Sequence, residues 1–108
     1  MRRGQIIIIA ARGDFTSKPR PHVIVQNDGL IAASTTVTAC PLTTRLLGTD
    51  LIRVRIDPDD DNGLARPSEI QVHLVTSVRK SRVDQIVGMA GSDVMIRVDQ
   101  ALQRWLAG

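Results

Sequence analysis

An arginine set between two prolines is the side chain in this sequence best suited to chemistry. Arg20 lies in the stretch KPRPHVIVQND, directly before a run of β-branched residues. A guanidinium stays charged and offers a planar fork of donors that matches a phosphate group. Because each proline restricts the backbone, less entropy is lost when the arginine is aimed at a ligand. Arg20 is therefore a candidate phosphate-binding residue, with a surface arginine in a tight turn as the alternative.

Hydroxyl and imidazole groups are the other candidates. Thr43 and Thr44 lie in PLTTR, where a threonine hydroxyl could bond a phosphate oxygen or simply cap a turn. His22 and His73 have no cysteine or paired carboxylate at metal-ligand spacing. The acidic loop 57–61 lacks the glycine and the closing glutamate of a twelve-residue calcium loop. No phosphate-binding glycine loop is present either, so we expect no metal and no cofactor.

Length and composition favour one ordinary globular domain over residues 1–108. Apolar residues make up 43% of the chain and charged residues 23%. Phe15 and Trp105 are the only aromatic residues, which argues against a module that stacks several bases. The single cysteine, Cys40, excludes an internal disulfide framework and is expected in the core. The longest apolar run is too short to span a bilayer, so we expect no membrane partner and a cytoplasmic location.

Basic residues are concentrated in the first half of the chain. Residues 1–55 carry eight Lys or Arg against three Asp, whereas residues 56–108 carry six against eight Asp or Glu. Such a basic half could face phosphates, although a solvated surface of mixed charge would give the same composition.

The hydrophobic pattern predicts short strands followed by one helix. The strands are expected at Gln5–Ala11, His22–Gln26, Ser34–Cys40, Asp50–Ile56, Glu69–Val75 and Asp84–Met89. Pro41 is expected to end the third strand, and residues 27–29 to form a turn. Ser92 is a candidate N-cap for an amphipathic helix whose apolar residues recur every three or four positions. Short strands closed by a helix favour a small barrel.

Five stretches together resemble the MazF/PemK/Kid toxins of bacterial toxin–antitoxin systems, most closely the short PemK-like branch. They are RRGQI, KPRPHVIVQND, STTVTACPLTTR, NGLARPSEIQVH and MIRVDQALQRWLAG, in the order found in that family. The resemblance implies a mainly β fold, an SH3-like barrel with a C-terminal helix, that forms a homodimer. It also implies a metal-independent, sequence-specific endoribonuclease that cuts single-stranded RNA, chiefly messenger RNA, and is neutralised by a cognate antitoxin.

The resemblance also implies roles for particular residues. Arg20 matches the catalytic arginine of the family's RP motif, and Thr43 matches a second catalytic residue, with Thr44 as the near alternative. His73 stands where the family often has an acidic residue. It could exchange a proton in the reaction, or it could be a partly buried histidine bonded to backbone.

Further residues are candidates for contact with RNA, and two other functions remain open. The candidates for RNA binding are Lys18, Thr44, Arg45, Ser68, Gln71 and Arg79, with Lys80 and Arg82 as further contacts to the RNA backbone. The segment VRKSR could equally be an exposed charged turn.

A relative of the same fold, CcdB, poisons DNA gyrase through a tryptophan near its C-terminus, which invites comparison with Trp105. A domain of this fold that has lost activity and only binds is the third alternative.

Overall fold

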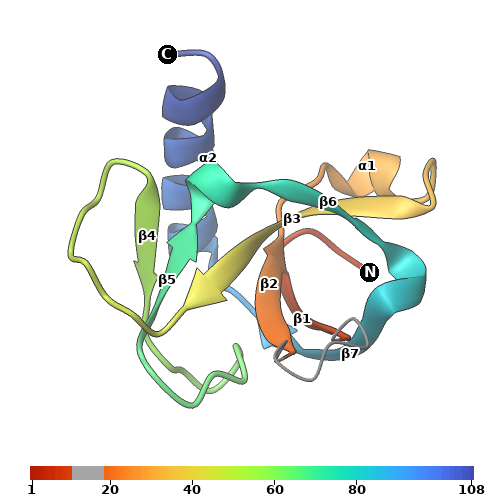
Figure 1. Ribbon diagram of the computed structural model, residues 1–108, viewed down its shortest axis with the longest axis horizontal. Coiled ribbons are helices and arrows are strands. Elements are labelled where there is room, and N and C mark those ends of the chain that lie inside the picture. The colour runs from red at the N-terminus through yellow and green to blue at the C-terminus, as the bar shows by residue number, and fades with distance from the viewer. Residues whose placement is uncertain (11–18) are drawn as a thin grey trace.

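The computed structural model describes residues 1–10 and 19–108, which form seven strands and a long C-terminal helix (Figure 1). The strands are β1 (Gln5–Ile9), β2 (Arg20–Ile24), β3 (Thr36–Thr43), β4 (Arg53–Ile56), β5 (Ser68–Gln71), β6 (Thr76–Arg79) and β7 (Val83–Met89). The helices are α1 (Asp28–Ile31) and α2 (Ser92–Leu106), with 3-10 turns η1 (Val72–Leu74) and η2 (Lys80–Arg82). The predicted mainly β fold with a C-terminal helix is confirmed.

The strands form one antiparallel sheet in the order β4-β5-β3-β2-β1-β7, with β6 also paired to β3. β3 is the central strand, because it pairs with β2 along one edge and with both β6 and β5 along the other. Figure 1 shows β3 crossing the molecule between these partners. Among the described residues no ladder joins β4 to β7, so the sheet is not closed. Closure into an SH3-like barrel is therefore not established by these ladders.

Each face of the sheet buries its own apolar cluster. The larger cluster combines alternate residues of the strands with one side of α2; its members include Ile6, Val23, Cys40, Leu42, Ile70, Val94 and Val98. The smaller cluster lies on the opposite face and consists of Ile7, Ile9, Ile24, Ile31, Val37, Ala39 and Val78, with Val83 packed against it. Neighbouring residues of a strand point to opposite faces, which is why Ile6 and Ile7 belong to different clusters. The expected core position of Cys40 is confirmed.

Several predicted boundaries were wrong. β3 does not end before Pro41 but continues to Thr43. Along one edge of β3 the partner changes from β6 at Ala39 to β5 at Leu42, and Pro41 lies in that gap. A proline has no N–H to donate, so a gap in the ladder is a position where a strand accepts it.

The predicted strand Glu69–Val75 is also interrupted. β5 ends at Gln71, and η1 separates it from β6, which was not predicted. On the other side of β3, β2 begins at Arg20, so this arginine belongs to the strand itself. The predicted turn at residues 27–29 is the start of the short helix α1, with Asn27 as its N-cap.

The predicted C-terminal amphipathic helix is confirmed as α2. Its N-cap is Gly91 rather than Ser92, and Asp93 lies in its first turn as predicted. Val94, Met95, Val98 and Ala101 are buried, whereas Trp105 near its end is half exposed. No helix in the described ranges is long and apolar enough to cross a membrane.

Candidate functional site

Arg20 and Thr43 lie at the same end of the β2–β3 pair. The described register of this pair runs from Ile24 opposite Ala39 to His22 opposite Pro41. Arg20 precedes this last pair by two residues along β2, and Thr43 follows it by two along β3. Residues opposite each other in an antiparallel pair share a face, as do residues two apart in one strand. The fold therefore sets both predicted catalytic side chains on one face of the sheet.

The Thr43 hydroxyl caps the turn that follows β3. Its Oγ1 accepts a hydrogen bond from the Arg45 backbone N–H at 3.1 Å. This turn-capping role is the structural alternative that we considered for the threonine. It uses only part of the hydrogen-bonding capacity of the hydroxyl. A threonine oxygen has a second lone pair and its own proton to donate. Thr44, the near alternative, is exposed and begins the loop 44–52.

A buried carboxylate organises this loop beside Thr43. Glu69 lies opposite Thr43 in the β3–β5 register and is 3% exposed. Its carboxylate accepts hydrogen bonds from the backbone N–H groups of Leu47 at 3.1 Å and Gly48 at 3.0 Å. It also accepts one from the guanidinium of Arg53 at 2.8 Å. The loop after Thr43 is thus tied to β5 by two backbone bonds to a single side chain, which Arg53 of β4 holds with a third.

Arg53 of β4 also bonds the loop, and we call the pair of Glu69 and Arg53, with their bonds to loop 44–52, the clamp. The same Nη1 that donates to Glu69 also donates to the Arg45 backbone carbonyl at 3.0 Å. Burial tends to raise the pKa of the Glu69 carboxyl, but the bonds from Arg53, Gly48 and Leu47 outweigh burial and hold that pKa below its usual value. Glu69 is therefore charged near neutral pH, and the backbone on both sides of Leu46 is held in place.

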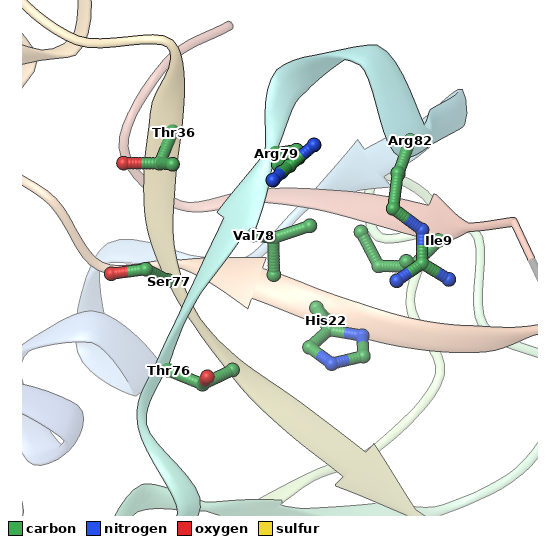
Figure 2. A pocket seen from close by; sticks show the side chains of 8 residues that line it. All are labelled: Ile9, His22, Thr36, Thr76, Ser77, Val78, Arg79 and Arg82. Atoms are coloured by element: carbon green, nitrogen blue, oxygen red, sulfur yellow. The ribbon is translucent and has the colours of Figure 1, made fainter. Parts of the chain in front are cut away.

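A polar hollow opens on the same face as Arg20 (Figure 2). Its volume is about 710 Å³, and it is lined by Ile9, His22, Thr36, Thr76, Ser77, Val78, Arg79 and Arg82. Figure 2 shows His22 of β2 between Thr76 on one side and Arg82 on the other. The hollow thus combines two guanidinium groups, three hydroxyl groups and one imidazole. Such a set could bind an anion, because all of the charged groups in it are positive or can become so.

His22 has a defined orientation in this hollow. Its Nδ1 lies 3.1 Å from the backbone carbonyl oxygen of Arg20. Partial burial lowers the pKa of the imidazole, and the positive charge of Arg20 lowers it further, while the bond to the Arg20 carbonyl raises it by less. His22 is therefore neutral near pH 7.

His73 occupies a different environment, on η1 rather than in a strand. Its ring meets the ring of Trp105 edge-on, with centroids 6.0 Å apart and planes at 77°. Its Nδ1 is buried and has no hydrogen-bond partner among the described residues. The expected alternative, a histidine bonded to backbone, is thus not seen at Nδ1, and packing on α2 takes its place.

The candidates for RNA binding do not all lie together. Arg79 lines the hollow, and Arg45 begins the clamped loop. Gln71 is partly buried beside Arg53, its register partner in β4, and its Oε1 has no bonding partner. Ser68 is buried and its hydroxyl donates to the Arg66 carbonyl at 3.0 Å, so a contact with a base would require that bond to break. Lys18 lies outside the described residues.

Sequence reasoning missed His22 and the Glu69–Arg53 clamp. His22 was tested only as a metal ligand, and its shared face with Arg20 follows only once Arg20 is known to belong to β2. Glu69 carried a signal too, as the only glutamate in the sequence and a member of a predicted strand. Within the described ranges no three His, Cys, Asp or Glu side chains gather in a way that could hold a metal ion.

A protein-family model and a relative of known sequence point to the same family. The model of the PemK-like, MazF-like toxin of type II toxin–antitoxin systems matches residues 2–106. The chain is 41% identical over 102 residues to a probable endoribonuclease MazF of Mycolicibacterium smegmatis, covering 94% of this chain and 93% of that protein.

Solved structures share the fold. A mycobacterial endoribonuclease in complex with its cognate antitoxin superimposes with a TM-score of 0.80 at 23% identity, covering 98% of this chain and 94% of that one. A MazE–MazF structure from Deinococcus radiodurans gives a TM-score of 0.78 at 19% identity, covering 99% and 95%.

Proposed function

This chain belongs to the PemK-like, MazF-like toxin family of type II toxin–antitoxin systems, and we propose that it is a metal-independent endoribonuclease that cuts single-stranded RNA at preferred sequences. The observation that carries the proposal is the 41% identity to a probable endoribonuclease over nearly the whole of both chains. The common face of Arg20 and Thr43 supports it, because residues 23 positions apart in the sequence are set at one end of one strand pair.

The proposed reaction uses the neighbouring 2′-hydroxyl of the RNA as its nucleophile. Its oxygen attacks phosphorus, and charge builds up on the non-bridging phosphate oxygens before the 5′-oxygen leaves. Arg20 binds these oxygens with its guanidinium, which is worth most where the charge develops. The Thr43 hydroxyl donates a further hydrogen bond to the phosphate while its oxygen still accepts from Arg45. Arg45, Thr44 and the arginines of the hollow contact the RNA backbone.

The proposal extends to partners and assembly. Two of the structural relatives are described with a cognate antitoxin or with MazE, so we expect an antitoxin to bind this chain and to exclude RNA. We also expect a homodimer of chains with the SH3-like barrel fold of the family. The half-exposed Trp105 and the exposed Leu74 and Leu106 are apolar surface that such an assembly could cover.

Cleavage in a chelator tests the activity. The purified protein is incubated with labelled single-stranded RNA in excess EDTA, and we expect fragments with a 5′-hydroxyl and a cyclic or 3′ phosphate. A gyrase supercoiling assay is run with the same preparation. Intact RNA together with inhibited gyrase would replace the ribonuclease by the gyrase poison. Intact RNA and active gyrase would leave an inactive binding module.

Arg20 is tested by two variants. Arg20→Ala should slow cleavage at least about a hundredfold, the size of effect seen when a donor to developing charge is removed. Arg20→Lys keeps the charge but loses the planar fork, and we expect it to recover only part of the rate. Since Arg20 is exposed, both variants should melt like the parent protein. A fully active Arg20→Ala would remove this residue from the site.

A further inference from the structure

The roles of Arg20 and Thr43 leave one requirement of the reaction without a residue. A 2′-hydroxyl attacks phosphorus effectively only when a base removes its proton. An arginine is a poor base because it holds its own proton so firmly, and a threonine hydroxyl is no better. From the geometry we propose that His22 is the general base of the RNA cleavage proposed above, and that His73 is not. This inference rests on the proposed function.

The position of His22 fits that role. It lies two residues after Arg20 on β2, and it pairs with Pro41, which lies two residues before Thr43 on β3. All four side chains consequently belong to one face of the β2–β3 pair. Residues two apart in a strand are separated by about 7 Å along it, so a long arginine side chain and a neighbouring imidazole can converge on one ribose and the phosphate that it carries. A phosphate held by Arg20 therefore brings the adjoining ribose into the neighbourhood of the imidazole.

The hydrogen bond to Arg20 prepares the imidazole for this task. A backbone carbonyl oxygen can only accept, so Nδ1 must carry the proton in the 3.1 Å contact with Arg20. In the neutral ring this leaves Nε2 with a free lone pair, the form that takes up a proton. The same carbonyl belongs to the residue that holds the phosphate, so one backbone unit aligns the base and the phosphate-binding side chain.

The surroundings keep the ring neutral until it acts. Among the described residues, the charged groups near it are Arg20 on its own strand and Arg79 and Arg82 in the lining of the hollow. None of the described residues that line the hollow is a carboxylate that could stabilise an imidazolium. Burial lowers the pKa of His22 by more than the bond to the Arg20 carbonyl raises it, and the charge of Arg20 lowers it further, so most of the protein carries the basic form at pH 7.

Opposite His22, the neighbouring strands add no further titratable group. Its register partners are Ile7 of β1 and Pro41 of β3, and neither side chain can ionise. His73, the alternative base, meets the ring of Trp105, and its buried Nδ1 has no partner in the part of the chain that the structure describes. It therefore lacks the oriented tautomer that His22 has.

The proposed step balances as a transesterification. Nε2 of His22 takes the proton of the 2′-hydroxyl as the 2′-oxygen forms its bond to phosphorus. The bond between phosphorus and the 5′-oxygen breaks, and that oxygen takes a proton from water. The products are a 2′,3′-cyclic phosphate and a 5′-hydroxyl, and the imidazolium returns its proton to solvent. No oxidant, metal or further reactant is consumed.

The test is a pH profile of single-turnover cleavage in excess EDTA, measured for the parent protein, His22→Gln and the matched control His73→Gln. The parent rate should rise with pH, with the midpoint of the rise below pH 6.5, the ordinary imidazole pKa, because the pKa of His22 is lowered. His22→Gln should lose about a hundredfold at pH 7, as expected for a general base, and the rise should disappear. His73→Gln should keep both the rate and the rise.

Two results separate this inference from the proposed function. If the parent protein cuts no RNA, the proposed ribonuclease is wrong and the role of His22 falls with it. If the parent cuts RNA and His22→Gln keeps its rate and its pH dependence, only the inference is overturned. Binding of a 2′-deoxy RNA analogue, which cannot react, should be nearly equal for the parent and His22→Gln, which distinguishes a base from a binding residue.

A measurement on the parent protein covers the case in which His22→Gln does not fold. The imidazole C–H signals of the two histidines are followed by NMR from pH 4.5 to 8. The His22 signal should titrate below pH 6.5 and at the same pH as the cleavage rate. A kinetic rise that instead follows the signal of His73 would overturn the assignment.

Discussion

The two faces of the sheet are built for different purposes, and each contains one of the two histidines. On the face covered by α2, fourteen buried residues form the larger cluster, and His73 packs at its margin against Trp105. On the other face the cluster is half that size, with seven buried residues, and the sheet opens into the hollow that holds His22. His22 has an oriented proton and basic neighbours, whereas His73 has an aromatic neighbour and an unpaired Nδ1.

This difference teaches that the type of residue alone does not indicate its role. Both histidines are partly buried, and both lie near β3. What separates them is which groups share their face. A side chain on the covered face is available for packing, while one on the open face can meet a ligand. The comparison predicts that substitutions on the covered face change stability and that substitutions on the open face change cleavage.

The largest loss of stability is expected at the centre of the covered face. Ile6→Ala removes a fully buried side chain from the larger cluster and should lower the free energy of unfolding by about 2–5 kcal/mol. Urea denaturation measures this. Cleavage by the folded fraction at low temperature should stay within about twofold of the parent rate, because Ile6 points away from Arg20. A folded Ile6→Ala protein that cannot cut RNA would break the separation of the two faces.

The elements of this fold were predictable where the pattern is strong. β1 is marked by a run of isoleucines and α2 by its amphipathic spacing. β1 begins at the predicted residue, Gln5, and α2 begins at Ser92, which was predicted as its N-cap. β3 was predicted too short, because a proline normally ends a strand and the change of partner that tolerates Pro41 is a tertiary feature. The split of residues 68–79 into β5, η1 and β6 has the same origin, since β3 pairs with both pieces and the chain must bend between them.

The candidate site was predictable in part. Arg20 and Thr43 came from the resemblance, and the fold then set them on a common face. The clamp of Glu69 and Arg53 joins residues 16 apart in the chain through a loop conformation, which no local pattern encodes. His22 needed only the alternation of the strand, but that argument requires Arg20 to be within β2, and the sequence had placed it in a loop.

An intermediate loss of stability is expected at the clamp, together with slower cleavage. Glu69→Gln leaves Arg53 without its carboxylate and weakens two bonds to the loop after Thr43. These partly buried groups are left with weakened hydrogen bonds, so we expect the free energy of unfolding to fall by about 1–3 kcal/mol. Cleavage should slow as well, because Thr43 and Arg45 lose their support.

The pH dependence of stability gives this prediction a sign. The pKa of Glu69 is lowered from 4.5 in the folded protein, so the folded state binds fewer protons than the unfolded chain below that pH. The stabilisation is present above pH 4.5 and is lost as the pH falls, and Glu69→Gln should lack this component. Asp57→Asn is the control, because Asp57 and its partner Arg55 are 65% and 46% exposed, and its effect should be below about 1 kcal/mol. Equal losses for the two variants would contradict the clamp.

The smallest loss of stability is expected at His73. A substitution there tests most directly whether the two faces of the sheet have different roles. His73→Gln removes the edge-on contact with Trp105, and such aromatic pairs contribute about 0.5–1.5 kcal/mol. The unpaired Nδ1 offsets part of that gain in the parent protein, so the melting temperature should fall only slightly. A double-mutant cycle with Trp105→Leu isolates the pair, and its coupling energy should account for most of the loss.

Cleavage by His73→Gln should remain within about twofold of the parent rate, because the ring packs on α2 and does not lie on the face that contains Arg20. A His73→Gln protein that cuts RNA a hundredfold more slowly with unchanged melting would place proton transfer on the covered face. The claim that the covered face serves stability and the open face serves cleavage would then be wrong.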